Sequence, residues 1–311
     1  MFNFIYNIVG HRRTYYIFSG ILIGLGLLAM VYAFATSGSI FQIGVDFRSG
    51  TRFEVQFTEP VTEEGIREVF NNQGVNNPSI IAIRGENYEN AWQIRSEFVS
   101  PEQAQAIVDE MQTELAPLIE GTTQIDSVSP TVGAEVTRAA VVAVFVAAVV
   151  ILFYIMLVFR QVPHSFRYGA SAVAAMMHDL LIISGFAAIT GVFLGWEVDA
   201  LFLTAVLTVV GFSLQDTIVT FDRIRENISR RPTERYEKLV DRSILETIHR
   251  SLVTQLSAMF IMVAILLFGG ASIKPFIAVL FVGMLSGTYS SIFIASPLLV
   301  SWEKGEIPLV S

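Results

Sequence analysis

Six long apolar runs dominate this sequence and restrict the folds that are open to it. They cover about residues 14–36, 139–159, 169–194, 200–221, 251–269 and 276–300. A helix needs about 20 predominantly apolar residues to cross the hydrocarbon core of a bilayer, and each run is close to that length or exceeds it. Only 15% of the 311 residues are charged, against about 25% in typical soluble domains. The sequence therefore predicts a polytopic α-helical membrane protein with six transmembrane helices.

The distribution of basic residues predicts the orientation of these helices. The first run is longer than the apolar core of a signal peptide, which usually has ~7–15 residues, so we expect it to be a retained span. Bases precede the first run, flank the loop between the second and third, and crowd the segment between the fourth and fifth: Arg12, Arg13, Arg160, Arg167, Arg223, Arg225, Arg230, Arg231, Arg235, Lys238, Arg242 and Arg250. The alternate loops are poor in bases. The positive-inside rule then places both termini and the loop 222–250 in the cytoplasm, and residues 37–133 outside.

The external segment, residues 37–133, has its own pattern of secondary structure. Strand-like stretches at 51–57, 79–84, 91–98 and 123–129 alternate with helix-like stretches at 62–74 and 100–115, and a turn is expected over 85–90. The resulting order βαββαβ predicts an external α+β domain of the ferredoxin-like type between helices 1 and 2. The segment carries 15 acidic residues against five arginines, which indicates a solvated surface and argues against binding nucleic acid.

Three domains follow from this layout. Residues 1–36 would form a cytoplasmic N-terminus and the first transmembrane helix, residues 37–133 the external domain, and residues 134–311 a five-helix transmembrane bundle. A fold of this kind does not by itself imply an enzyme. The sequence contains no P-loop, no HExxH and no GxSxG motif, and it has no cysteine that could form a disulfide or hold a metal. We expect no enzymatic activity, no cofactor and no metal.

Ionisable residues within the spans are the strongest functional candidates, because a charge near the bilayer centre costs ~2.5–3.5 kcal/mol on insertion scales. Asp216 lies six residues before Asp222, about 9 Å inside the membrane at the rise of an α-helix. Ser213 and Thr220 lie on its side of the helix. Asp216 could form a structural ion pair, or it could bind and release protons. Thr204, Thr208, Gly211 and Gln215 share another face, which suits close helix packing.

Arg250 and the pair His178–Asp179 could likewise have a structural or a functional role. Arg250, at the start of the fifth span, could be an interfacial arginine or the cation that faces Asp216. His178 and Asp179 lie near the middle of the third span. Side chains of adjacent helical residues point about 100° apart, so these two cannot face one partner together. They either contact neighbouring helices or belong to a proton relay.

The basic 222–250 segment could anchor the chain to membrane lipid, or it could bind an acidic partner.

Four motifs resemble those of one family of membrane proteins. "GVDFRSGTRFEV" (44–55) resembles the Gly-x-Asp-Phe-x-Gly-Gly-Thr signature of the SecD/SecF family, with Gly44, Asp46, Phe47, Gly50 and Thr51 at the matching positions. "GFSLQDTIVTFDRIREN" (211–227) is similar to the fourth-span signature of its SecF branch. "PTVGAEV" (130–136) and "HRSLVTQL" (249–256) are further matching elements. Phe212 and Gln215 replace the usual Tyr and Asn, and Ser49 replaces a Gly, which fits less freely where φ must be positive.

The resemblance implies a function that the residues alone do not. Members of this family pair with a SecD-like subunit in a twelve-span assembly related to the RND transporters. The assembly works in the bacterial inner (plasma) membrane with the SecYEG channel and the SecA motor, and uses the proton gradient to promote preprotein translocation. The family's membrane carboxylate and fifth-span arginine fall on Asp216 and Arg250. From their positions within the spans, and not from the resemblance, His178, Asp179, Gln215 and Thr220 are candidates for a relay or for helix contacts. Two alternatives remain: an RND-type exporter of small molecules, and a purely structural partner subunit.

Overall fold

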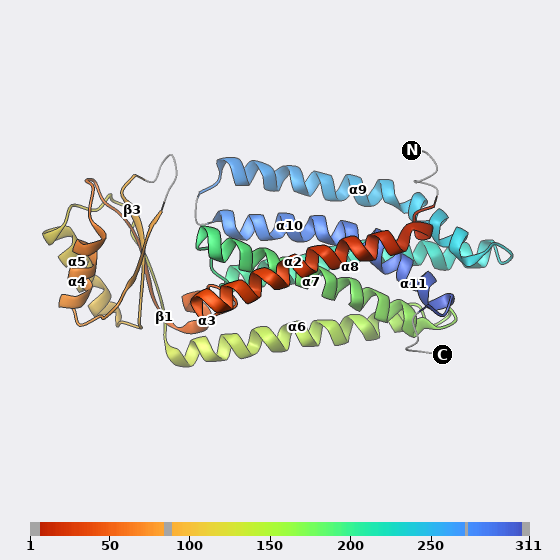
Figure 1. The fold of residues 1–311 in the computed structure, drawn as a ribbon, viewed down its shortest axis with the longest axis horizontal. Coiled ribbons are helices and arrows are strands. Elements are labelled where there is room, and N and C mark those ends of the chain that lie inside the picture. The colour runs from red at the N-terminus through yellow and green to blue at the C-terminus, as the bar shows by residue number, and fades with distance from the viewer. Residues whose placement is uncertain (1–6, 84–88, 271–272, 307–311) are drawn as a thin grey trace. The chain divides into compact units, whose positions relative to one another are not determined.

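The computed structural model describes residues 7–83, 89–270 and 273–306. The chain forms two compact units. Residues 43–141 make up the first, which we call the sheet unit. Residues 1–42 and 142–311 make up the second, which we call the helical unit. Figure 1 shows the elements of both.

The sheet unit contains a four-stranded antiparallel sheet with two helices. Its elements follow in the order β1 (Gly50–Gln56), α4 (Glu63–Asn72), β2 (Ser79–Ile83), β3 (Ala91–Ser96), α5 (Pro101–Glu114) and β4 (Gln124–Val128). The strands lie in the order β2-β3-β1-β4, and each pairs antiparallel with its neighbour. The predicted βαββαβ arrangement is therefore confirmed. The expected turn at 85–90 falls mostly on residues 84–88, which lie outside the described part of the chain.

Local sequence signals explain where the two helices of this unit begin. The Thr62 side chain accepts a hydrogen bond from the Gly65 amide (3.2 Å), and the Ser100 side chain accepts one from the Gln103 amide (3.2 Å). Both are N-caps that satisfy an otherwise unpaired amide of the first turn. The apolar faces of both helices then meet one face of the sheet in a core that includes Phe53, Val55, Ile66, Phe70, Ile107 and Met111.

The helical unit supplies most of the six long apolar segments. They are Val9–Ser37, Pro130–Val158, Ser165–Leu194, Ala200–Arg230, Tyr236–Phe268 and Lys274–Glu303. The corresponding helices are α2 (Arg12–Ser37), α6 (Pro130–Val158), α7 (Ser165–Leu194), α8 (Ala200–Arg230), α9 (Tyr236–Phe268) and α10 (Lys274–Ser290). A π-turn at Ser291–Ala295 joins α10 to α11 (Ser296–Glu303). Six segments long and apolar enough to span a membrane are thus present among the described residues, and α6 begins in the sheet unit.

Helix α10 lies centrally in this unit and packs against α7, α8 and α9, while α2 packs on α7. Small residues allow the close approaches. A Cβ on Gly26 of α2 would lie 2.9 Å from the Cα of Gly185 on α7, and a Cβ on Gly287 of α10 would lie 2.9 Å from the Ser213 Cβ on α8. Small residues at helix contacts are typical of membrane proteins. Large apolar side chains on α2, α6 and α9 stay exposed, as expected for surfaces that face lipid.

The helices are longer than the apolar runs predicted. Helix α8 continues to Arg230 and α9 begins at Tyr236, so most of the 222–250 segment is helical and only residues 231–235 connect the two. The extensions hold together by polar contacts: Asn227 Nδ2 donates to Ser243 Oγ (2.9 Å), and Arg223 pairs with Glu246 (2.6 Å). Hydropathy marks where a helix leaves the apolar region, and it does not mark where the helix ends.

Candidate functional site

Asp216 lies buried between α8 and α9, with 5% of its surface exposed. Its Oδ2 atom accepts a 2.9 Å hydrogen bond from Nε2 of Gln255 on α9. Ser251, one turn before Gln255, is a second polar neighbour of the same carboxyl. Both are buried. The carboxyl of Asp216 is therefore held by neutral groups in a buried contact between two helices.

Arg250 and Thr220 occupy different places around this site. Arg250 is exposed. Within the described part of the chain it forms no ion pair with Asp216, although its charge is close enough to act on that carboxyl. Thr220 is buried, and its Oγ1 donates to the backbone oxygen of Asp216 (3.2 Å) and lies 3.4 Å from Thr247 Oγ1. Thr220 thus joins α8 to α9 and does not contact the carboxyl.

Asp179 is the centre of a second polar cluster, which we call the Asp179 cage. The residue is fully buried. Its Oδ1 accepts from Ser286 (2.6 Å), and its Oδ2 accepts from Ser290 (2.8 Å) and Ser213 (2.7 Å). These serines come from α10 and α8, while Asp179 is on α7. The cage therefore joins three helices through one carboxylate, and Ser213 is one turn from Asp216 on α8.

His178 connects the Asp179 cage to α2. Its Nδ1 lies 3.1 Å from Oδ1 of Asp179, and its Nε2 lies 3.1 Å from Oγ of Ser19. Ser19 in turn donates to the Tyr289 hydroxyl (3.3 Å). The histidine faces α2, while the aspartate faces the serines of α8 and α10. A continuous line of hydrogen bonds thus runs from α8 through α7 to α2.

One face of α8 stays open in this chain. Thr204, Gly211 and Gln215 are exposed, and a Cβ added to Gly211 would meet nothing within 4 Å. Among the residues that the structure describes, the Gln215 side chain makes no hydrogen bond. An amide in an apolar medium without a partner is costly. The face expected to pack against other helices is thus left free by this chain.

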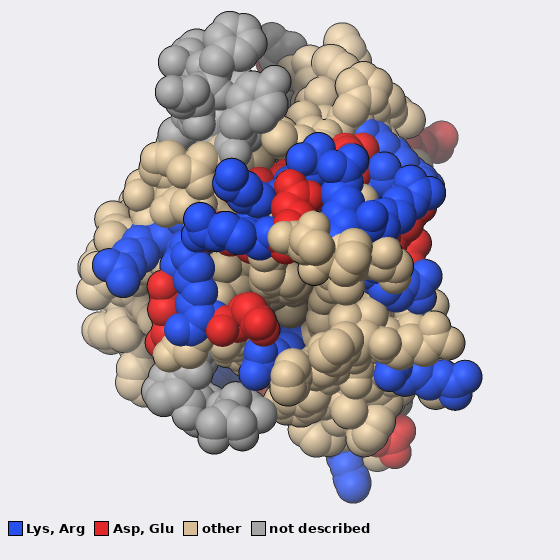
Figure 2. Space-filling model, turned by 90° about the vertical axis from the view of Figure 1, so that its right-hand side faces the viewer, with Lys and Arg blue, Asp and Glu red and all other residues tan. Residues whose placement is uncertain are grey.

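Charged residues gather at the end of the helical unit where α2 begins and α8 ends (Figure 2). Many are paired with each other. Arg12 bridges to Glu306 (2.5 Å) and Glu237 (3.3 Å), and Lys304 also reaches Glu237 (2.8 Å). In the connection between α8 and α9, hydrogen bonds from Arg242 hold the pKa of Glu234 below its ordinary value of 4.5. This basic end is a network of ion pairs that fixes the first helix to α9 and to the chain after α11.

The signature segment builds a one-turn helix followed by two residues with positive φ. Gly44 caps the one-turn helix α3 (Val45–Arg48), which contains Asp46 and Phe47. Ser49 follows with φ 66° and ψ 160°. Gly50 has φ 132°, and a Cβ there would lie 2.5 Å from the Ser96 oxygen, so only glycine fits. The segment therefore needs glycine-like conformations at two successive positions.

The segment is also tied to α6 and to the sheet. Thr51 is fully buried, and its Oγ1 lies 2.7 Å from Ser127 Oγ and accepts from the Val99 amide (3.1 Å). Oγ1 of Thr137 on α6 donates to the Phe47 oxygen (3.1 Å). These contacts give the segment a structural role within the sheet unit, because they connect β1 to the start of α6.

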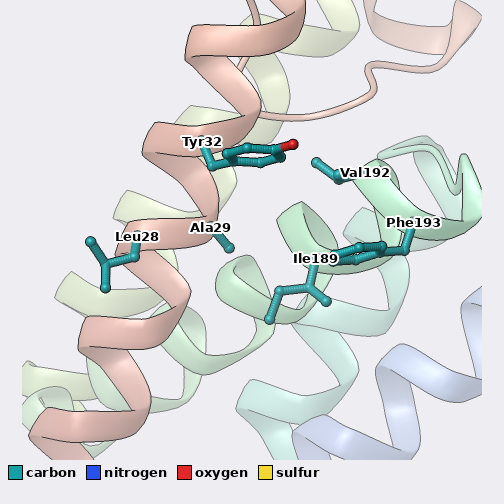
Figure 3. A pocket seen from close by; sticks show the side chains of 6 residues that line it. All are labelled: Leu28, Ala29, Tyr32, Ile189, Val192 and Phe193. Atoms are coloured by element: carbon teal, nitrogen blue, oxygen red, sulfur yellow. The ribbon is translucent and has the colours of Figure 1, made fainter.

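The structure offers no other site of obvious chemistry among the described residues. Within them, no three His, Asp or Glu side chains lie close enough together to hold a metal ion. A pocket between α2 and α7 is lined by Leu28, Ala29, Tyr32, Ile189, Val192 and Phe193 (Figure 3). Its lining is almost entirely apolar, so it suits a lipid chain and not an ion.

Sequence reasoning missed several residues of these clusters. Ser286 and Ser290 lie four residues apart in the last span, which places them on one helix face, and this spacing is a signal that could have been used. Gln255 lies in the HRSLVTQL motif (249–256) and is one of several polar residues at the start of the fifth span. Which of them faces Asp216 depends on how α8 and α9 are rotated against each other, and periodicity does not give that.

The chain is similar to known proteins over nearly its whole length. A family model described as "Protein export membrane protein SecD/SecF, C-terminal" matches residues 90–305, and one described as "SecD/SecF GG Motif" matches residues 36–61. "Protein translocase subunit SecF" of Anaerolinea thermophila is 40% identical over 96% of this chain and 95% of its own length. "Protein translocase subunit SecDF" of Bacillus subtilis is 32% identical over 95% of this chain and 38% of its own length.

A solved structure gives the same result for the fold. The crystal structure of SecDF, a translocon-associated membrane protein from Thermus thermophilus, aligns with a TM-score of 0.77 at 30% identity. The alignment covers 96% of this chain and 38% of that chain. In both SecDF proteins, the region similar to this chain is thus part of a much longer polypeptide.

Proposed function

Because this chain belongs to the SecD/SecF family of protein-export membrane proteins, we propose that it couples proton binding at Asp216 to the export of preproteins. Its relatives are protein translocase subunits of the SecF type, so its function is that of a translocase subunit in a membrane. The role is transport, and we infer that no catalysis by this chain is involved.

The observation that carries the proposal is the burial of Asp216 among neutral groups in a membrane-spanning helix. A buried carboxylate that is not matched by a contacting cation is costly, which favours binding of a proton. Arg250 acts on it from a distance and without an ion pair, so the carboxyl is not locked in its charged form. Moving one charge through the membrane potential is worth ~2.3 kcal/mol per 100 mV. That free energy shifts a two-state equilibrium roughly fifty-fold.

The hydrogen bonds around Asp179 provide a physical route from α8 to α2. A displacement of α8 on proton binding moves Ser213, and through Asp179 and His178 it reaches Ser19 on α2. Helix α2 leads directly into the sheet unit, which begins at residue 43. In this scheme Asp179 and His178 transmit the movement and Asp216 binds the proton.

A SecD-like partner is supported by relatives that carry both parts in one chain, because this chain aligns with only 38% of the SecDF proteins. The open face of α8, with the unpaired amide of Gln215, is the surface that we assign to that partner. We further propose that the basic end of the bundle faces the cytoplasm, in agreement with the positive-inside rule, and that residues 37–133 lie outside. The SecYEG channel and the translocating preprotein are the remaining proposed partners.

The alternative of a small-molecule exporter is tested by depleting this chain in cells and supplying the gene again. Export of a secreted preprotein and efflux of a fluorescent dye would be measured in the same cells. We expect preprotein export to fall and recover with the gene, while dye efflux stays constant. Loss of dye efflux with normal preprotein export would contradict the proposal. Recovery of export by a chain that carries Asp216→Asn and Arg250→Gln together would favour a purely structural subunit.

A further inference from the structure

Gln255 has an unusual hydrogen-bonding state for a buried side chain. Only 2% of its surface is exposed, its Nε2 donates to Asp216, and its Oε1 is buried with no partner among the described residues. Buried polar atoms are nearly always hydrogen-bonded, and each exception calls for an explanation. Here the unpaired acceptor belongs to the same amide that touches the proposed proton-binding carboxyl.

A primary amide can serve both protonation states of a carboxyl. It donates through its nitrogen to an ionised carboxylate, and it accepts through its oxygen from a protonated one. The two ends are nearly equal in size, and the last torsion of a glutamine is broad and roughly two-fold. A half-turn of the amide therefore exchanges donor for acceptor without a change in the space that the side chain fills.

The other polar groups near the carboxyl do not combine a donor to Asp216 with a buried acceptor that has no partner among the described residues, as Gln255 does. Thr220 is committed to the backbone oxygen of Asp216, and Thr247 donates to the backbone oxygen of Ser243 (2.9 Å). Arg250 is the charged group on α9 that acts on this carboxyl, and a guanidinium has donors only. Ser251 can reorient its hydroxyl, but it adds no second atom. While Gln255 Nε2 donates to the ionised carboxylate, its Oε1 atom has no partner in the described part of the chain. That oxygen is the acceptor that a protonated Asp216 would need.

We propose that Gln255 is a positioning residue that follows the protonation of Asp216, with its amide donating to the carboxylate and turning to accept from the carboxylic acid. The inference rests on the proposed function, in which Asp216 exchanges a proton. The turn gives both forms of the carboxyl a hydrogen bond in a buried contact between two helices. The direction of the hydrogen bond between α8 and α9 then depends on whether Asp216 carries a proton.

Infrared difference spectroscopy on the full chain, reconstituted with its SecD-like subunit, tests this directly. The protein would carry isotope-labelled glutamine side-chain carbonyls, and spectra at high and low pH would be subtracted. Hydrogen bonding to an amide or carboxyl oxygen lowers its carbonyl stretching frequency. We expect the appearance of a protonated carboxyl band, which Asp216→Asn removes, together with a downward shift of one labelled glutamine band. That glutamine shift should be absent in both Asp216→Asn and Gln255→Asn, and it should persist in the control Gln161→Met, which alters an exposed glutamine.

The outcomes distinguish the role inferred for Gln255 from the proposed function, which is proton exchange at Asp216. A carboxyl band that titrates and depends on Asp216 while no glutamine band moves would overturn the role of Gln255 and leave the proposed function intact. A pH difference without any carboxyl band that depends on Asp216 would overturn both. In Gln255→Met we expect gradient-dependent export to fall about tenfold or more, because a hydrogen bond to a charged group is lost. Export equal to wild type in that variant would also contradict the proposal.

Discussion

Ser213 of α8, which lies one helical turn before Asp216, donates a 2.7 Å hydrogen bond to Asp179 of α7. The helix that carries the proposed proton site is thereby fixed to the most deeply buried carboxylate of the bundle. Two serines of α10 complete the shell of Asp179. The stability of the bundle and the position of Asp216 should therefore both depend on this cage.

Replacing Asp179 by Ala should destabilise the bundle by about 2 kcal/mol or more, because several buried donors lose their acceptor at once. Asp179→Asn should cost less, since its amide oxygen still accepts and its nitrogen can donate to a serine hydroxyl. Thermal unfolding of the detergent-solubilised protein measures both. Equal stability of Asp179→Ala and wild type would show that the cage does not hold the helices together.

Gly26 should tolerate no side chain. An alanine there would place its Cβ 2.9 Å from the Gly185 Cα, so α2 would have to move away from α7, at a cost of about 1–3 kcal/mol. Gly24 is a matched control on the same helix, because a Cβ there meets nothing within 4 Å. We expect Gly26→Ala to lower the unfolding temperature and Gly24→Ala to leave it unchanged or raise it. The reverse order would disprove the close contact.

Ser49→Gly should stabilise the sheet unit. Ser49 adopts φ 66° and ψ 160°, a region that is populated almost only by glycine and that costs other residues about 1–3 kcal/mol. Removing the side chain relieves this strain, although the freer unfolded chain offsets part of the gain. Hydrogen exchange of the amides in β1 reports the local stability. Slower exchange in Ser49→Gly is expected, and faster exchange would argue against strain at this position.

Stability of the sheet unit should also depend on pH through Glu110. Hydrogen bonds from the side chains of Gln73 and Asn72 lower the pKa of Glu110 below its ordinary value of 4.5. A carboxyl with a lowered pKa in the folded state contributes stability that is fully present above the ordinary value and is lost as the pH falls through the lowered one. Hydrogen exchange in α4 and α5 should therefore be slower in wild type than in Glu110→Gln at neutral pH, and equal in acid. A difference that grew on acidification would contradict this sign, and Glu114→Gln serves as the exposed control.

Much of the fold could be predicted because its signals are local. The six spans follow from the length of the apolar runs, and the two helices of the sheet unit follow from Thr62 and Ser100 as caps and from the apolar positions behind them. The antiparallel order of the sheet then follows from the βαββαβ sequence of elements. The continuation of α8 beyond Phe221 was not visible, because its polar contacts with α9 replace the apolar periodicity that marks a span.

The candidate site could be predicted only in part, because the contacts of its residues depend on tertiary packing and not on local signals. Asp216 and Asp179 stand out because a carboxyl within an apolar run is rare and costly. Their partners do not stand out, since serine and glutamine are ordinary in such helices. Arg250 was a candidate for the cation that faces Asp216 or for an interfacial arginine, and the residue that contacts the carboxyl is Gln255, five positions further on. Which of these faces α8 depends on helix rotation, which is set by tertiary packing such as the contact of Gly287 with Ser213.

The most direct test of the account is preprotein export in cells whose only copy of this chain carries Asp216→Asn. The amide keeps the size of the side chain and cannot exchange a proton. The rate of preprotein release would be followed with and without an uncoupler that collapses the proton gradient, in wild type, Asp216→Asn and Asp216→Glu. The account predicts that Asp216→Asn loses the uncoupler-sensitive part of export while the protein is present at normal levels, and that Asp216→Glu keeps some of it. Export by Asp216→Asn that remains as fast and as sensitive to the uncoupler as wild type would contradict it.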